Sequence, residues 1–144
     1  MITLKQFLKH KGGMIWSVSS SATVLQALKI MAEKNVGALM VMDSGRIVGM
    51  ISERDYARKV ELEGKSAKDT LVKDIMTDRV LYVRPDESIE DCMALMSEKH
   101  FRHLPVIDKE HILGLISIGD VVRIVISKQK FIISQLENYI SGNR

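Results

Sequence analysis

Residues 49–55 read GMISERD and residues 114–120 read GLISIGD, which is one pattern of glycine, two apolar residues, serine, two variable residues and aspartate. The match extends without a gap over residues 18–58 and 83–123. Thirteen of these 41 aligned pairs are identical. Self-similarity at a fixed spacing indicates a repeated structural unit. The sequence therefore predicts two copies of one small domain.

Each copy has the residue pattern of strand, helix, strand, strand, helix. A capping box, in which a serine or threonine is followed three residues later by a polar acceptor, predicts first helices that begin at Thr23 and Ser88. Second helices should begin near Ser52 and Ser117. The apolar faces of the first helices repeat at helical spacing and comprise Val24, Ala27, Leu28 and Met31, and Ile89, Cys92, Met93 and Met96.

Short runs of β-branched and apolar residues predict the strands of each copy. These elements predict an α+β fold, with two units related by a pseudo-twofold axis, their sheets packed face to face and helices at the flanks. The expected strands are residues 15–18, 38–42 and 47–51, and 80–83, 104–107 and 112–116, with tight turns over 43–46 and 108–111.

Polar stretches between the copies suggest the domain boundaries. We expect a lead-in with a short amphipathic helix, and a long helix from Asp120 to Ile140 that continues past the second copy. The expected segments are a lead-in over residues 1–14, a first domain over 15–62, a linker over 63–76, a second domain over 77–128 and a helical extension over 129–144.

The composition argues against several classes of partner. The chain has 144 residues, 46% of them hydrophobic, and a formal net charge of +3, with acidic and basic residues interleaved. Interleaved charges are typical of a solvated surface, and only 5% of the residues are aromatic, which disfavours a nucleic-acid interface. No apolar run is long enough for a membrane span, and the N-terminus has no apolar run of seven or more residues followed by the small-residue cleavage site of a secretory signal. We predict a cytoplasmic protein that binds neither nucleic acid nor membrane.

The residues that most often carry catalysis or metal binding do not form a recognisable site. The single cysteine, Cys92, has apolar neighbours and is predicted to lie in the core of a protein from a reducing compartment. A catalytic thiol is the alternative, but it needs an exposed, electropositive setting. The four histidines lack metal-ligand spacing, and no nucleophile is paired with a base. We predict no catalytic residue and no metal site.

The repeated Ser-x-x-Asp motif can bind a nucleotide. A serine where a strand meets a helix can cap backbone N–H groups and offer a hydroxyl to a phosphate. The aspartates, Asp55 and Asp120, can each accept hydrogen bonds from the two vicinal hydroxyls of a ribose. The alternative is that each motif is only a capping box, in which the aspartate accepts from the serine N–H.

The repeated motif, together with RHLPVID at residues 102–108 and DIMT at 74–77, resembles the cystathionine-β-synthase (CBS) domain pair over about residues 10–128. The run from residue 51 to 77 and the ending at 138–140 look most like the stand-alone CBS-pair proteins of bacteria and plant organelles. This resemblance implies two nucleotide sites in clefts between the repeats.

The resemblance also implies which residues line the two clefts. The Asp55 pocket would contain Ser52, Arg54, Asp55, Thr77, Val80, Phe101, Arg102 and His103. The Asp120 pocket would contain Trp16, Val36, Gly37, Ala38, Ile116, Ser117, Gly119 and Asp120. The arginines make the Asp55 pocket the better phosphate site, unless Arg102 and His103 are ordinary surface residues.

The function that this implies is a non-catalytic regulatory module. It would bind AMP, ADP, ATP or NAD(H), signal occupancy to an unidentified partner protein, and form a homodimer through exposed helix faces, including Val121, Val122, Val125 and Ile126. The alternatives are a structural dimerisation module with vestigial pockets and an enzyme that uses the nucleotide.

Overall fold

The computed structural model describes residues 3–11 and 15–142, which fall into two compact units. The repeat-1 unit comprises residues 14–81, and the repeat-2 unit comprises residues 1–13 with 82–144. Each unit combines a small sheet with helices, so the predicted α+β class is confirmed.

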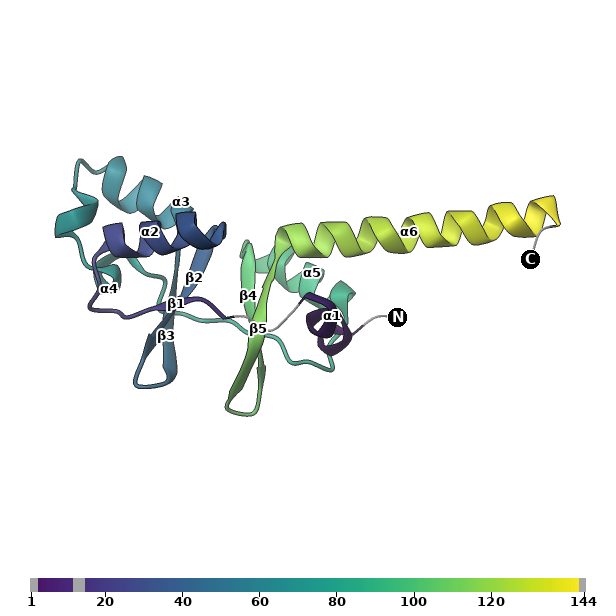
Figure 1. Cartoon of the computed structure of the whole chain (residues 1–144), viewed down its shortest axis with the longest axis horizontal. Helices are drawn as coiled ribbons and strands as arrows, with labels where there is room; N and C mark the ends of the chain where they lie inside the picture. The colour runs from purple at the N-terminus through teal and green to yellow at the C-terminus, as the bar shows by residue number, and fades with distance from the viewer. Residues whose placement is uncertain (1–2, 12–14, 143–144) are drawn as a thin grey trace. The chain divides into compact units, whose positions relative to one another are not determined.

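The repeat-1 unit contains a three-stranded sheet in the order β1-β2-β3. β1 is parallel to β2, and β2 is antiparallel to β3. The hairpin turn between β2 and β3 has positive φ angles at Ser44 (52°) and Gly45 (76°), as tight hairpin turns require. The elements of this unit are β1 (Ser17–Val18), α2 (Val24–Lys34), β2 (Ala38–Asp43), β3 (Arg46–Ser52), α3 (Glu53–Tyr56), the π-helix η1 (Ala57–Glu61), the 3-10 helix η2 (Ala67–Asp69) and α4 (Val72–Ile75) (Figure 1).

The repeat-2 unit has a two-stranded antiparallel sheet, β4-β5. As predicted, α5 begins with a capping box at Ser88 and Asp91, matching the Thr23 and Gln26 capping box that begins α2. Cys92 and Met96 of the predicted apolar face are buried, but Met93 is 44% exposed, so its prediction is wrong. The elements are α1 (Leu4–Lys11), α5 (Ile89–Lys99), β4 (His103–Asp108), β5 (His111–Ser117) and α6 (Ile118–Ser141).

The predicted strand at residues 80–83 is wrong, because only Val83 pairs with β4. Its N–H donates to Pro105 O, and its carbonyl accepts from Ile107 N, both at 2.9 Å. A parallel ladder would continue through the N–H of Pro85 on one side and of Pro105 on the other, and proline has none. The chain's two prolines therefore limit this pairing to one residue. The corresponding strand of repeat 1 is also shorter than predicted, at Ser17–Val18.

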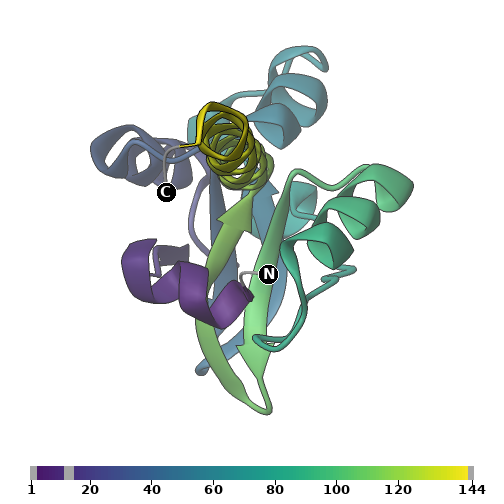
Figure 2. The same cartoon turned by 90° about the vertical axis from the view of Figure 1, so that its right-hand side faces the viewer.

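Each unit is completed by a helix that precedes the other repeat in the sequence. In the repeat-1 unit, the first residue of α4 donates from Val72 N to Ala22 O at 2.8 Å. In the repeat-2 unit, α1 does the same from Leu4 N to Glu87 O at 3.2 Å. Figures 1 and 2 show α1 beside the β4-β5 hairpin. The fold thus exchanges the two leading helices between the repeats.

The last helix, α6, spans 24 residues and leaves the body of its unit (Figure 1). Val121 is buried within its own unit, so its prediction as part of an exposed dimer face is wrong, whereas all residues from 126 to 142 are exposed. Over residues 3–11 and 15–142, none of the helices has the combination of length and apolar character needed to cross a membrane.

Candidate functional site

The first Ser-x-x-Asp motif lies where β3 ends and α3 begins. Ser52 is the N-cap residue, and its Oγ accepts a hydrogen bond from Asp55 N at 3.2 Å. The Asp55 carboxylate returns the contact, because its Oδ2 accepts from Ser52 N at 2.9 Å and from Ser52 Oγ at 3.1 Å. The motif is a complete capping box, as the alternative interpretation predicted, and it uses one carboxylate oxygen.

The second oxygen of Asp55 faces a lysine. Lys59 Nζ lies 3.3 Å from Asp55 Oδ1, four residues further along the chain, and also donates to Ile75 O at 2.9 Å. The Lys59 side chain is 42% exposed and that of Asp55 is 16% exposed. A long, partly exposed lysine has the rotamer freedom to move aside, so Oδ1 is the oxygen that a ligand hydroxyl can reach.

The second motif repeats this geometry at the junction of β5 and α6. Asp120 Oδ2 accepts from Ser117 N at 2.9 Å, and Ser117 Oγ accepts from Asp120 N at 3.1 Å. Here the second oxygen pairs with Arg123, one turn along α6. The Asp120 side chain is only 5% exposed, so this aspartate is less accessible than Asp55.

The residues before β2 and β4 lie beside these motifs within each unit. Gly37 O accepts from Glu53 N at 3.1 Å, and Arg102 O accepts from Ile118 N at 2.8 Å. In the strand register, Ala38 is opposite Ser52 and His103 is opposite Ser117. Each unit therefore holds its strand entrance against the cap of its own helix.

Thr77 also lies near the first motif. Its backbone exchanges two hydrogen bonds of 2.9 Å with Met50, two residues before Ser52. This places Thr77 in the same unit as Ser52 and Asp55. The assignment of residues from both repeats to one pocket stays a prediction.

The remaining predicted site residues differ in exposure. Arg54 and Arg102 are exposed. Exposure is compatible with both alternatives, a phosphate-binding arginine and an ordinary surface arginine. Trp16 is half-buried, and Lys34 Nζ lies 4.4 Å from the centre of its ring. Ile116 is buried, and the other predicted side chains are half-buried, namely those of Val36, Val80, Phe101 and His103.

Two cations at the motifs were missed from the sequence, Lys59 and Arg123. Their spacing from the aspartates could have identified them, because side chains three or four residues after an aspartate lie on the same helix face. Arg58 occupies the position equivalent to Arg123, yet the structure pairs Asp55 with Lys59 instead. In this segment the chain forms the π-helix η1, which changes the residue that faces the aspartate.

Cys92 does not have the setting of a nucleophile. It is fully buried, and burial raises the pKa of its thiol to about 11. This confirms the prediction of a core cysteine. Among residues 3–11 and 15–142 there is also no group of three or more histidine, cysteine, aspartate or glutamate residues placed to hold a metal ion.

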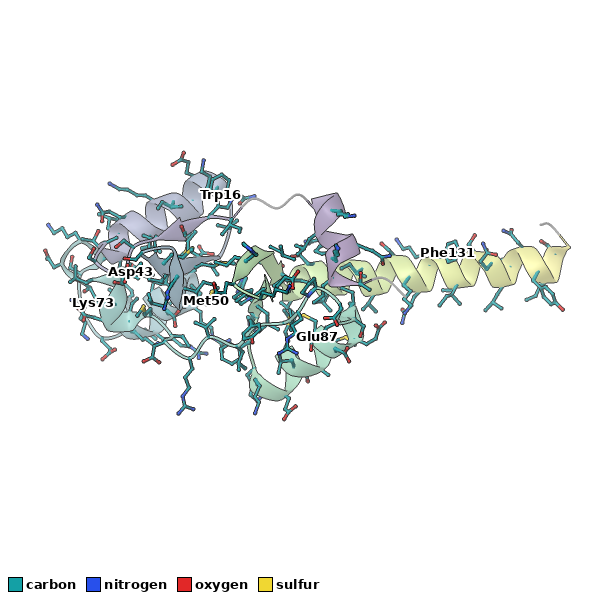
Figure 3. All side chains as sticks on the ribbon, turned by 90° about the horizontal axis from the view of Figure 1, so that it is seen from below. Trp16, Asp43, Met50, Lys73, Glu87 and Phe131 are labelled. Carbon is teal, nitrogen blue, oxygen red and sulfur yellow. The ribbon has the colours of Figure 1, made fainter. Side chains whose placement is uncertain are left out.

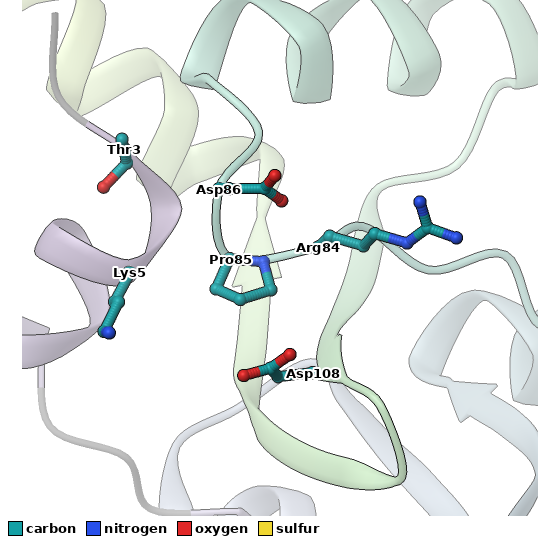
Figure 4. Close-up of a pocket in the computed structure, with 6 residues that line it drawn as sticks. All are labelled: Thr3, Lys5, Arg84, Pro85, Asp86 and Asp108. Carbon is teal, nitrogen blue, oxygen red and sulfur yellow. The ribbon is translucent and has the colours of Figure 1, made fainter.

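A cavity of about 470 Å³ lies in the repeat-2 unit, and neither Ser117 nor Asp120 lines it (Figure 4). Positive and negative side chains share its wall, so it has no clear preference for an anion or a cation. Among the described residues, its lining contains none of the predicted site residues and consists of Thr3, Lys5, Arg84, Pro85, Asp86 and Asp108.

The comparisons with known proteins agree with the repeat geometry. The CBS domain family model matches residues 15–62 and 72–127. The CBS domain-containing protein CBSX3, mitochondrial, of Arabidopsis thaliana is 38% identical over 150 residues, which cover 97% of this chain and 72% of the relative. The solved structure of a protein with CBS domains from Burkholderia ambifaria is also similar to this chain. The two sequences are 50% identical, and the TM-score is 0.85 over 89% of this chain and 96% of that chain.

A more distant structure shares the fold. The CBS domain pair of protein MJ0100 is 24% identical, with a TM-score of 0.75 over 86% of this chain and 99% of that chain, and its structure is a complex with 5′-methylthioadenosine and S-adenosyl-L-methionine. The family model alone covers most of the chain, in two copies that each include one copy of the sequence repeat. The chain therefore belongs to the CBS domain family and carries a CBS domain pair, a regulatory module.

Proposed function

We propose that this CBS pair binds an adenine nucleotide, with each Ser-x-x-Asp motif holding a ribose and the start of a phosphate chain. The observation that carries the proposal is the repeated geometry of the motif. In both units the capping box uses Oδ2 of the aspartate, and Oδ1 pairs with a cationic side chain from the following turn. A ribose diol can take the place of that cation, which then becomes free to pair with a phosphate.

The chemistry of the relative supports the class of ligand. Both compounds in the MJ0100 complex contain an adenosine, that is, an adenine base on a ribose with two vicinal hydroxyls. For the present chain we propose AMP, ADP, ATP or NAD(H), since each adds phosphates for which Lys59 and the exposed Arg54 and Arg102 offer positive charge. Nucleotide occupancy would shift the balance between two conformations that a partner protein distinguishes.

Calorimetric titration of the purified full chain with AMP tests the proposal, preceded by native mass spectrometry of the protein as purified. We expect a saturable step for AMP and a bound mass that matches an adenylate. GMP should compete poorly, because guanine reverses the donor and acceptor pattern of the adenine edge. Equal competition by GMP, or no binding of any adenylate, would contradict the proposal.

The titration, together with measurements of turnover and of molecular mass, distinguishes the two rival functions. Turnover of ATP or NAD in proportion to protein concentration would favour an enzyme. A stable homodimer that binds no adenylate would favour a structural dimerisation module. We further propose that the chain forms a homodimer in the cytoplasm, and light scattering should report twice the chain mass.

A further inference from the structure

The outer part of α6 carries a continuous apolar stripe that its own unit leaves uncovered. Ile132, Ile133 and Leu136 are 48%, 55% and 56% exposed, and Tyr139 and Ile140 are 85% and 82% exposed. The helix extends past α1 and α5 (Figure 1). A run of exposed large apolar side chains on one helix marks an interaction surface.

The apolar residues of this stripe recur with a period of seven residues. Three heptads fit residues 122–142, with eight of the nine a, d and e positions apolar and serine at every f position, namely Ser127, Ser134 and Ser141. This period of 3.5 residues is the pattern of a helix that packs along another helix. The stripe comprises Val122, Gln129 and Leu136 at a, Val125, Ile132 and Tyr139 at d, and Ile126, Ile133 and Ile140 at e.

The stripe is distinct from the side of α6 that packs on the repeat-2 unit. That side contains the buried Val121 and Lys128, whose Nζ lies 2.8 Å from Glu90 Oε1 on α5. Both residues occupy g positions. Phe131, labelled on α6 in Figure 3, is at a c position, outside the stripe, and is 64% exposed. Val125, the first d position, is half-buried, whereas every a, d and e position from Ile126 onward is exposed.

Gln129 indicates the orientation of the partner helix. It is the polar member of the stripe, at an a position. In a parallel, in-register pair, a positions face each other, so Gln129 meets its own copy and the two amides can exchange hydrogen bonds. In an antiparallel pair centred on the stripe, Gln129 faces Ile132, which leaves a buried amide without a partner. A single polar residue at an a position is known to set register in this way.

We propose that the a/d/e stripe of α6 packs against the same stripe of a second copy of this chain, in parallel and in register. A lipid surface fits less well, because an interfacial helix carries lysine and arginine across its polar face. Here α6 has three basic residues outside the stripe, and two of them pair within the unit, Arg123 with Asp120 and Lys128 with Glu90, while the face opposite the stripe carries the three serines. This proposal adds a defined surface and orientation to the homodimer, and it does not depend on nucleotide binding.

Ile133→Glu in the full chain tests the surface, measured by sedimentation over a wide concentration series. A charge at the centre of the stripe should weaken self-association by roughly 30-fold or more, the effect of losing one strong interface residue. Ser134→Glu is the matched control, since it adds the same charge on the opposite face, and it should associate like the wild type. Circular dichroism and AMP titration should be unchanged in both variants.

Three outcomes would overturn the surface. They are wild-type protein that is monomeric at every concentration, Ile133→Glu that associates like the wild type, and monomeric wild type that binds phosphatidylserine vesicles through α6. Because AMP binding is titrated separately, loss of self-association and loss of the nucleotide site are distinguishable.

Disulfide trapping tests the orientation. Leu136→Cys should form a rapid cross-link between copies, because the same a position faces itself in a parallel pair, while Cys92 is buried. Ser134→Cys is the control and should not cross-link. In the antiparallel pair, two copies of Leu136 would be about 16 Å apart at a rise of about 1.5 Å per residue. A cross-link that requires Val125→Cys together with Leu136→Cys would overturn the parallel arrangement.

Discussion

In the repeat-1 unit Gly49 lies beneath the backbone of the segment that follows α4, whereas in the repeat-2 unit its counterpart Gly114 lies beneath a side chain of α1. A Cβ on Gly49 would lie 2.8 Å from Thr77 O and 2.7 Å from Met76 Sδ. A Cβ on Gly114 would lie 2.9 Å from Leu8 Cδ2. The equivalent glycine of each repeat thus allows the close approach of a different group, a backbone segment in one unit and a side chain in the other. The duplicated sequence determines the hairpins and caps, and the leading helices make the units differ.

The largest expected effect is on the helix that α1 contributes to the repeat-2 unit. Leu4 is fully buried although it precedes the whole first repeat. Leu4→Ala should lower the free energy of unfolding by about 2–5 kcal/mol, the usual cost of a buried leucine truncation. Urea unfolding measures this change.

Lys5→Ala is the control on the same helix, because Lys5 is exposed and should change stability by less than about 0.5 kcal/mol. A similar, small cost for both variants would show that α1 does not complete the repeat-2 unit.

The next comparison concerns the two aspartates. Asp55→Ala should weaken AMP binding at the tighter site by about tenfold to several hundredfold, because two charge-assisted hydrogen bonds to the ribose are lost. Asp120→Ala should leave that site largely intact, since the predicted Asp120 pocket has Gly37 and Gly119 where the predicted Asp55 pocket has Arg102 and Arg54. Calorimetric titration with AMP of both variants measures the difference.

Asp91→Ala separates ligand binding from helix capping. Asp91 forms a capping box with Ser88 like those at the two motifs, with Ser88 N donating to Asp91 Oδ2 at 3.2 Å. Its loss should cost about 1 kcal/mol of stability and leave AMP affinity unchanged.

If Asp120→Ala removes the tight step and Asp55→Ala retains it, the two pockets are assigned in the wrong order.

A third comparison uses the two glycines directly. Gly49→Ala should destabilise the protein by about 1–3 kcal/mol, because the new methyl group meets a backbone carbonyl that cannot rotate away. Gly114→Ala should cost less than about 1 kcal/mol, since the Leu8 side chain can change rotamer. Thermal unfolding of both variants checks the order, and a larger loss for Gly114→Ala would contradict it.

The features that the sequence predicted are those set by residues close together along the chain. The caps at Thr23, Ser52, Ser88 and Ser117 depend on contacts three residues apart, and the structure shows all of them. The missing strand at residues 80–83 was also readable, because Pro85 and Pro105 remove the N–H groups that would extend the ladder.

The exchange of α1 and α4 was not predictable from a local pattern. Leu4 is buried in a unit whose other segment begins at residue 82, and Val72 bonds to Ala22, far earlier in the chain. The repeat shift of 18–58 onto 83–123 does not include either helix. For the candidate site, the motif residues and their geometry followed from the sequence. The cations Lys59 and Arg123 did not, because a π-turn after α3 decides which side chain reaches Asp55.

The smallest effect compares one core position in the two helices that follow the caps. Cys92 of α5 corresponds to Ala27 of α2, and both are fully buried. Burial raises the pKa of Cys92 from 9.0 to about 11. Below pH 9.0 the thiol is protonated in both the folded and the unfolded chain, so stability is unaffected. Above pH 9.0 only the unfolded chain releases the proton, and stability falls until the folded thiol also titrates.

Cys92→Ala replaces this thiol with the side chain that the other repeat uses. One pH unit above 9.0, the wild type should have lost roughly 1 kcal/mol of stability more than the variant, since a tenfold change in an acid dissociation constant corresponds to about 1.4 kcal/mol. Urea unfolding of both proteins between neutral and alkaline pH measures the difference, in which the titration of lysines and tyrosines cancels. If the unfolding free energies of the two proteins change with pH in parallel, the thiolate forms as easily in the folded chain as in the unfolded chain. Position 92 would then not be shielded from water as the buried Ala27 is.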